Sequence, residues 1–138
     1  MTDIGVIGGA GYVGLVTGIG LAALGHKLIS QDIDQRRLEM LRRGKSAVHE
    51  DGLEPILRQL IDMDQISFTD DQAVTIQNSD ALFLAVGTPS LADGAADLSA
   101  VISVAERLRD EIDKYTVIVM KSTVPVGTIN AMAGILSQ

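Results

Sequence analysis

The sequence predicts an α/β fold: a Rossmann-type, doubly wound parallel sheet in a single domain. Short apolar segments of strand length alternate with segments of helical periodicity, which is the pattern of a parallel sheet with helices on both faces. A glycine-rich turn follows the first strand-like segment, and Asp32 follows the second. Their separation is close to the roughly 20 residues expected of a dinucleotide-binding fingerprint.

The composition is that of one domain with an aliphatic core. The chain has 138 residues, of which 46% are hydrophobic, with two Phe, two Tyr and no Trp. The absence of Cys excludes disulfide bonds and thiolate metal sites. The net charge of −7 argues against a nucleic-acid partner, because nucleic-acid surfaces of proteins are basic. We expect neither a bound metal nor a nucleic acid.

The most apolar long stretch, Ala10–Leu24, predicts a helix packed on a sheet rather than a membrane span. It is too short to cross a bilayer and contains four glycines. The N-terminal residues Met1–Asp3 lack the positive charge of a secretory leader. We therefore expect no membrane partner and a cytoplasmic location.

The first three elements are predicted by apolar runs and a glycine stop. Ile4–Ile7 is a short apolar run, as expected of a strand. The helix within Ala10–Leu24 should end at Gly25, because glycine is favoured just after the last helical residue. Lys27–Gln31 is expected to form the second strand.

Two helices should follow the second strand. Asp34 can cap a helix that runs to Arg43, with Gly44 as its stop signal. Asp51 and Glu54 resemble a capping box for the next helix. The apolar residues of that helix recur at helical spacing: Leu53, Ile56, Leu57, Leu60 and Ile61.

Strands and helices then alternate again. Ile66–Phe68 is strand-like, and Thr69–Gln72 has the spacing of a capping box for a short helix. Ala81–Val86 is an uninterrupted apolar run, as expected of a strand covered on both faces. Gly87–Gly94 is expected to be a loop, and Asp97 can cap the helix after it.

The last two elements complete the alternation. Thr116–Met120 is rich in β-branched residues and strand-like, and Gly127 precedes a final helical segment that reaches Gln138. The predicted order is therefore β-α-β-α-α-β-α-β-α-β-α.

The main candidate for a ligand site is Gly8–Gly14, which reads Gly-Gly-Ala-Gly-Tyr-Val-Gly. Gly9-x-Gly11-x-x-Gly14 is the dinucleotide fingerprint, whereas a frame that begins at Gly8 has the spacing of short-chain dehydrogenases and sugar epimerases. In either frame the missing Cβ atoms let the backbone approach a pyrophosphate, which the N–H groups at the helix N-terminus then bind. We expect Gly9, Gly11 and Gly14 to form this cofactor site.

Asp32 is expected to select NAD over NADP. A carboxylate at this place accepts hydrogen bonds from the ribose hydroxyls of adenosine and repels a 2′-phosphate. Asp34 can cap the next helix, which leaves Asp32 free. Arg36 and Arg37 have two interpretations: they attract a 2′-phosphate, or they are solvated residues of the first helical turn.

Two more loops follow strands at the sheet edge where α/β proteins bind ligands. One is Ala85–Ser90, after the fourth strand, and the other is Lys121–Thr128, after the fifth. Each contains hydroxyl side chains and a proline, where a nicotinamide would lie. The same residues also occur in ordinary turns.

Taken together, the motifs resemble the UDP-glucose/GDP-mannose dehydrogenase family over essentially the whole chain. The resemblance lies in Gly11-Tyr-Val-Gly-Leu15, Val86-Gly-Thr-Pro-Ser90, Asp93-Gly-Ala-Ala-Asp-Leu-Ser99 and Lys121-Ser-Thr-Val-Pro-Val-Gly-Thr128. The Lys-Ser-Thr form of the last motif is most similar to the UDP-glucose 6-dehydrogenase branch. Gly8–Gly11 departs from the family pattern, because one residue is inserted into the usual Gly-x-Gly.

The resemblance implies NAD as the cofactor and assigns residues to it. Tyr12 and Val13 would contact NAD in the glycine turn, Asp32 would bind the ribose, and Arg37 would lie near the adenosine end.

The resemblance also implies residues for the reacting end of the cofactor. Thr88 and Ser90 would line the central part of NAD. Thr123 would lie beside the nicotinamide, close to the reacting sugar, and is the candidate catalytic residue of this chain.

The family oxidises the C6 alcohol of UDP-glucose or a related nucleotide sugar to the carboxylate in two NAD-dependent steps, through a thiohemiacetal on a cysteine. Because this chain has no Cys, residues 1–138 are expected to be the NAD-binding domain of a longer enzyme and inactive alone. The central helix and the substrate domain would lie outside it. The resemblance further implies a homodimeric full-length enzyme that serves polysaccharide biosynthesis.

Two alternative functions stay open on the sequence. The frame that begins at Gly8 suits an NAD-dependent sugar epimerase of the short-chain type, although neither Tyr12 nor Tyr115 has the lysine four residues on that such enzymes need. A non-catalytic NAD-binding module is the other alternative.

Overall fold

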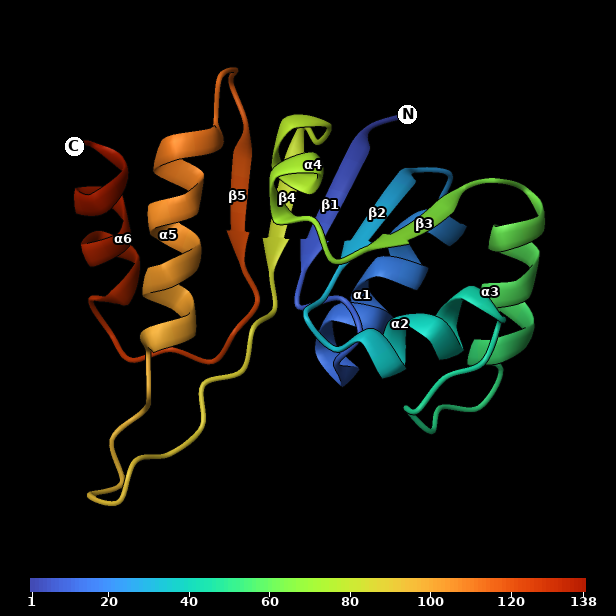
Figure 1. Ribbon diagram of the computed structural model, residues 1–138, viewed down its shortest axis with the longest axis horizontal. Coiled ribbons are helices and arrows are strands. Elements are labelled where there is room, and N and C mark those ends of the chain that lie inside the picture. The colour runs from blue at the N-terminus through green and yellow to red at the C-terminus, as the bar shows by residue number, and fades with distance from the viewer.

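Five parallel strands form the sheet of the computed structural model, which describes residues 1–138 (Figure 1). The strands are β1 (Asp3–Ile7), β2 (Lys27–Gln31), β3 (Ile66–Thr69), β4 (Ala81–Leu84) and β5 (Val117–Met120). They lie in the order β3-β2-β1-β4-β5. The strand order therefore reverses between β1 and β4, which is the switch point where such sheets bind ligands.

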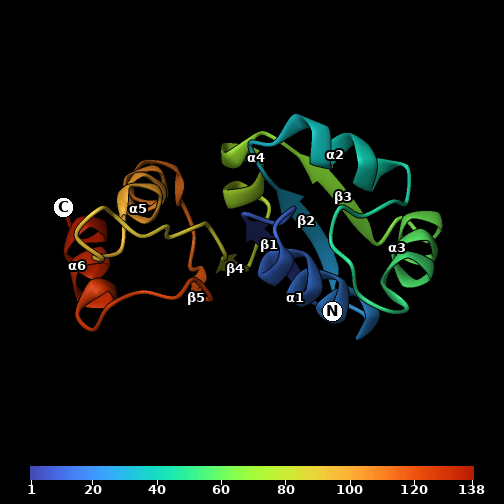
Figure 2. The ribbon, with the colours of Figure 1, turned by 90° about the horizontal axis from the view of Figure 1, so that it is seen from below.

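Six helices connect the strands, and the order of elements is the predicted one. They are α1 (Tyr12–Ala23), α2 (Gln35–Arg42), α3 (Leu53–Asp62), α4 (Gln72–Gln77), α5 (Ser99–Glu111) and α6 (Thr128–Leu136). Figure 2 shows α1 on one side of the sheet and α4 and α5 on the other. The predicted doubly wound parallel sheet is confirmed.

The side chains of alternating strand residues pack into two separate aliphatic cores, one on each face of the sheet. Val6 packs with α1 and α3 in one core, whereas the next residue, Ile7, packs with α5 in the other. Successive side chains of a strand point to opposite faces, so β1 belongs to both cores. Each fully buried aliphatic side chain stabilises the fold by about 1.5–3 kcal/mol.

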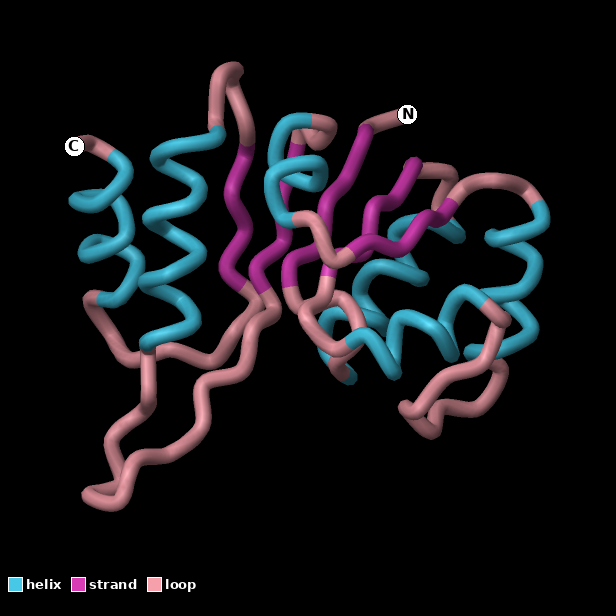
Figure 3. The backbone as a smooth tube through the Cα atoms, viewed as in Figure 1, coloured by secondary structure: helices cyan, strands magenta, loops and turns pink.

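The carboxyl ends of the strands all point to one edge of the sheet, the lower edge in Figure 3. Two predicted elements are shorter at this edge than expected. The strand predicted over Ala81–Val86 ends at Leu84, and the helix predicted over Ala10–Leu24 begins at Tyr12. The residues left over, Ala85 to Val86 and Ala10 to Gly11, line or approach the edge as loop.

Of the predicted helix caps, the one at Asp34 is confirmed. Its side chain accepts a hydrogen bond from the Arg37 N–H at 3.1 Å. The box predicted from Thr69 is wrong in its cap, because Asp71 caps α4 by accepting from the Val74 N–H at 3.2 Å. Thr69 instead accepts from the Asp71 N–H, which turns the chain into the helix.

The capping box predicted at Asp51 and Glu54 is also wrong. Gly52 occupies the cap position of α3 with a φ of 79°, so the Asp51 side chain does not reach the first turn. Glu54 points back to the preceding loop, where it accepts from the Ser46 N–H at 3.1 Å. A glycine in the left-handed region makes the turn that the side-chain cap was expected to make.

The helices α1, α2 and α3 end in the same pair of backbone hydrogen bonds, and at α2 the left-handed residue is the predicted stop Gly44. At the predicted stop Gly25, φ is 101°, the Gly25 N–H donates to Ala22 O, and the His26 N–H donates to Leu21 O. This is the Schellman arrangement, which glycine favours. The same arrangement ends α3, but there the left-handed residue is Asp64, with a φ of 53°.

We predict that Asp64→Gly stabilises the domain by up to about 1 kcal/mol, because it removes the Cβ penalty of a left-handed backbone. Gly25→Ala is the matched control at the equivalent position. No atom lies near its new Cβ, so its expected destabilisation of about 1 kcal/mol is conformational alone. Urea unfolding of the three proteins measures both effects, and a destabilised Asp64→Gly protein would contradict the prediction.

Candidate functional site

A cleft of about 700 Å³ opens at the carboxyl edge of the sheet, over the switch point between β1 and β4. Its walls come from the turn after β1, the end of β2, the loops after β4 and β5, and one face of α5. Its volume is in the range of sites for small molecules and cofactors. Segments that are far apart in sequence therefore meet in one place because every parallel strand ends at this edge.

The glycines of the turn have different tasks. Gly8 has a φ of 84°, and a Cβ there would lie 2.6 Å from the Ala85 carbonyl oxygen. A Cβ on Gly14 would overlap the carbonyl oxygen of Gly8, and one on Gly9 would overlap the Ser30 side chain. These three glycines make the turn and bring α1 close to it.

Gly11 is the glycine that faces free space. The nearest atom to a Cβ built on it lies 3.7 Å away, and its φ of −77° and ψ of 168° suit any residue. It precedes α1, whose first turn has no side-chain cap and no acidic residue. The free N–H groups of this turn make a site for an anion, and Gly11 leaves the approach to them open.

Asp32 lies beside this helix terminus, half-buried at the end of β2, and lines the cleft. Its two carboxylate oxygens accept from the Ala10 N–H at 2.9 Å and from the Asp34 N–H at 3.0 Å. Each oxygen keeps a lone pair for another donor. Asp32 thus fixes the glycine turn and remains able to accept from a pair of hydroxyls.

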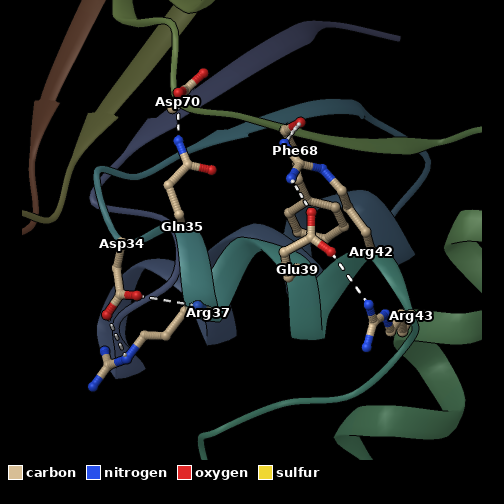
Figure 4. A network of polar contacts seen from close by, with 8 residues as sticks. All are labelled: Asp34, Gln35, Arg37, Glu39, Arg42, Arg43, Phe68 and Asp70. Carbon is tan, nitrogen blue, oxygen red and sulfur yellow. Dashed lines mark hydrogen bonds and ion pairs between the residues drawn. The ribbon is translucent and has the colours of Figure 1, made fainter.

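Of the two arginines that sequence analysis left open, only Arg37 lines the cleft. Figure 4 shows its guanidinium beside Asp34 at the start of α2, with Nε 3.5 Å from the carboxylate. Both side chains are about half exposed, so this ion pair contributes at most about 1 kcal/mol. The pair leaves most of the guanidinium available to a ligand in the cleft.

Gln31 and Ile33 flank Asp32 in the lining and were missed by sequence analysis. Gln31 is buried, its carbonyl oxygen accepts from both Gly8 and Gly9 N–H groups, and its side chain donates to Asp70 O at 3.2 Å. The sequence signal that could have identified Gln31 as a site residue is its polar side chain at the end of an otherwise strand-like run. Ile33 is 88% exposed and gives the cleft an apolar wall.

The loops after β4 and β5 close the other end of the cleft. Thr88 and Thr123 both line it, and the Thr88 hydroxyl donates to the Thr123 carbonyl oxygen at 2.8 Å. The hydroxyl of Ser122, another lining residue that the prediction missed, donates to Val86 O at 2.7 Å. Thr123 is exposed, and its own hydroxyl has no hydrogen bond within the chain.

The structure brings most of the predicted cofactor residues to this cleft. The lining includes Gly11, Tyr12, Val13, Asp32, Arg37, Thr88 and Thr123. Gly9 and Gly14 lie behind it and shape the turn. Ser90 also lies outside it, because it pairs with Ala96 in a short antiparallel bridge within the loop after β4.

Tyr12 links the glycine turn to the loop before α3. Its hydroxyl donates to a Glu50 carboxylate oxygen at 2.8 Å. This hydrogen bond to a carboxylate raises the pKa of Tyr12 above its ordinary value. The phenol therefore stays protonated, and its ring lies at the mouth of the cleft.

The structure contains neither a cluster of metal-ligating side chains nor a helix that could span a membrane. No three His, Asp or Glu side chains converge as metal ligands would. None of the helices has both the length and the apolar character that a membrane crossing requires.

Residues 2–138 match the UDP-glucose/GDP-mannose dehydrogenase family, NAD binding domain. The UDP-glucose 6-dehydrogenase of Pseudomonas aeruginosa is 43% identical over 128 residues, which cover 93% of this chain and 28% of that protein. UDP-glucose 6-dehydrogenase YwqF of Bacillus subtilis is 38% identical over 130 residues, covering 94% and 30%. The chain thus spans less than a third of the length of these relatives.

Solved structures agree. A ternary complex of GDP-mannose dehydrogenase from Pseudomonas aeruginosa superposes with a TM-score of 0.89 at 31% identity, covering 98% of this chain and 33% of that one. A UDP-glucose dehydrogenase from Pyrobaculum islandicum gives a TM-score of 0.88 at 35% identity, covering 99% and 33%. Motifs, fold, cleft and relatives lead to one assignment: the chain belongs to the UDP-glucose/GDP-mannose dehydrogenase family, as its NAD-binding domain.

Proposed function

We propose that this domain holds NAD in a UDP-glucose 6-dehydrogenase, which oxidises the C6 alcohol of UDP-glucose to the carboxylate. The observation that carries the proposal is the continuous cleft from the α1 terminus and Asp32 to Thr123. The names of the relatives and the Lys-Ser-Thr form at Lys121 support UDP-glucose over other nucleotide sugars. Membership of the family leaves the epimerase alternative, which rested on the Gly8 frame, without support.

The residues of this chain have separable roles in the proposal. The N–H groups that follow Gly11 bind the pyrophosphate, and Asp32 accepts from the adenosine ribose. Arg37 lies beside the adenosine. Bound NAD supplies the hydride acceptor.

At the other end, Thr88 borders the middle of the cofactor. The free hydroxyl of Thr123 orients the reacting alcohol or a water molecule. The cysteine nucleophile must come from outside this chain, which has none. A cytoplasmic, homodimeric enzyme of polysaccharide biosynthesis is part of the proposal on the family resemblance alone.

The first prediction separates binding from folding at Gly11. Gly11→Ala should weaken NAD binding by roughly tenfold or more, because its methyl group stands where the phosphates approach the turn. Its stability should change by less than about 1 kcal/mol, since the site is roomy and the backbone is allowed to Ala. Calorimetric titration and urea unfolding measure the two quantities.

The matched control for Gly11 is Gly20→Ala on the exposed side of α1. No atom lies near its new Cβ, so the substitution should stabilise the helix by about 0.8–1 kcal/mol and leave NAD affinity unchanged. Full NAD affinity in Gly11→Ala would refute the assignment of the pyrophosphate to this helix terminus.

The second prediction concerns the choice between NAD and NADP. The wild type should bind NAD more tightly, and Asp32→Ala should weaken NAD by roughly 10- to 100-fold, the loss of a charge-assisted hydrogen bond of about 1.5–3 kcal/mol. Because Asp32 also holds the Ala10 N–H, the ratio of NAD to NADP affinity is the decisive quantity. Tighter NADP binding by the wild type would mean that Arg36 or Arg37 dominates the site.

The third prediction is that this chain binds NAD without turning over UDP-glucose. It lacks a cysteine, and a partial site loses the positioning of alcohol against nicotinamide, which is worth roughly 7–11 kcal/mol of barrier. NADH absorbance with purified chain, NAD and UDP-glucose, then GDP-mannose, should show no sustained rise. A rise that persists in protein free of any full-length enzyme would contradict the assignment.

A further inference from the structure

The loops after β4 and β5 are joined beyond the point where the sheet ends. The last backbone hydrogen bonds between these strands run from the Lys121 and Ser122 N–H groups to Leu84 O, at 2.8 and 2.9 Å. Past Leu84 no backbone hydrogen bond connects the two loops. What connects them there is a pair of side-chain hydroxyls.

The two hydroxyls bond in opposite directions. Ser122, on the β5 loop, donates to Val86 O on the β4 loop at 2.7 Å. Thr88, on the β4 loop, donates to Thr123 O on the β5 loop at 2.8 Å. We call this pair of hydrogen bonds the loop brace. The Ser122 hydroxyl holds the residue that precedes Thr123 in the chain, and the Thr88 hydroxyl holds the carbonyl group of Thr123 itself.

The brace matters because the β4 loop has little else to hold it. This loop runs from Ala85 to Leu98, and only its first residue bonds to the sheet, where the Ala85 N–H donates to Ile7 O at 2.8 Å. The backbone bonds after Ala85 are internal to the loop, such as Leu91 N–H to Ala95 O and Asp97 N–H to Pro89 O. Ser122 and Thr88 are half-buried. Each hydroxyl has one proton, and the brace uses it, so neither side chain can donate to a ligand at the same time.

We propose that Ser122 and Thr88 are positioning residues, which hold Thr123 so that its free hydroxyl faces the nicotinamide end of the cleft. The inference rests on the proposed function, because it takes the direction of the cofactor from there. It changes the role of Thr88, whose hydroxyl proton serves the brace rather than the cofactor. Ser122 gains a positioning role that it can perform without contacting a ligand.

The proposal makes the brace specific to one half of the cofactor. Asp32 and the α1 terminus, which bind the ADP-ribose half, share no hydrogen bond with either loop of the brace. Loss of the brace should therefore loosen the nicotinamide end alone. ADP-ribose, which lacks nicotinamide, is the probe that separates the two halves.

The experiment measures the dissociation constants of NAD and ADP-ribose by calorimetry for the wild type, Ser122→Ala and Thr88→Val. Removing one hydrogen bond of the brace should weaken NAD by about fivefold. ADP-ribose should change by less than about twofold, within the spread of neutral substitutions. Thr88→Ser keeps the hydroxyl and should retain wild-type affinity for both ligands.

Thr116→Ala is the control at the opposite end of β5. Its hydroxyl donates to Lys114 O, far from the cleft, so both affinities should stay at their wild-type values. Circular dichroism verifies folding, and Thr88→Val carries the test if Ser122→Ala does not fold.

Equal weakening of NAD and ADP-ribose, or no change in either, would overturn the brace as a positioning device. A wild-type chain that binds neither ligand would overturn the proposed function and the inference with it. We expect the wild type to bind both ligands. We expect Ser122→Ala and Thr88→Val to bind ADP-ribose with wild-type affinity and to lose affinity for NAD alone.

Discussion

The close approach of α1 to the end of β1 is the constraint on which the rest of this domain depends. It exists because Gly14 has no Cβ where the Gly8 carbonyl oxygen lies, and because Gly8 adopts a left-handed backbone beside Ala85. Side chains at these places would push the helix off the sheet. With them absent, the uncapped helix terminus points into the cleft, and the helix buries Leu15 and Ile19 in the core beneath it.

The cleft arises from the same geometry. Because the strands are parallel, their carboxyl ends all lie at one edge of the sheet. The glycine turn, Asp32 and the two hydroxyl-bearing loops follow these strand ends and therefore meet there. What differs from one wall to the next is how each is held. Asp32 is fixed by two backbone N–H groups. Thr123 instead depends on two hydroxyl groups, that of Ser122 in its own loop and that of Thr88 in the loop after β4.

The glycine turn, where we expect one more residue than the family pattern has, is held by the end of β2. Gly8 and Gly9 both donate to the carbonyl oxygen of Gln31, and the next N–H, of Ala10, donates to Asp32. The turn is therefore hydrogen-bonded along its length to the end of β2.

The sequence by itself determined the fold class, the order of elements, the glycine turn and Asp32, because periodicity, stop signals and fingerprint spacing are local properties of the chain. Only the tertiary structure decided which glycine of the turn faces free space, that Ser90 lies outside the cleft, and that Ser122 bonds to Val86. These depend on contacts between residues far apart in sequence. No local pattern encodes the distance between two loops that meet only when β4 and β5 pair.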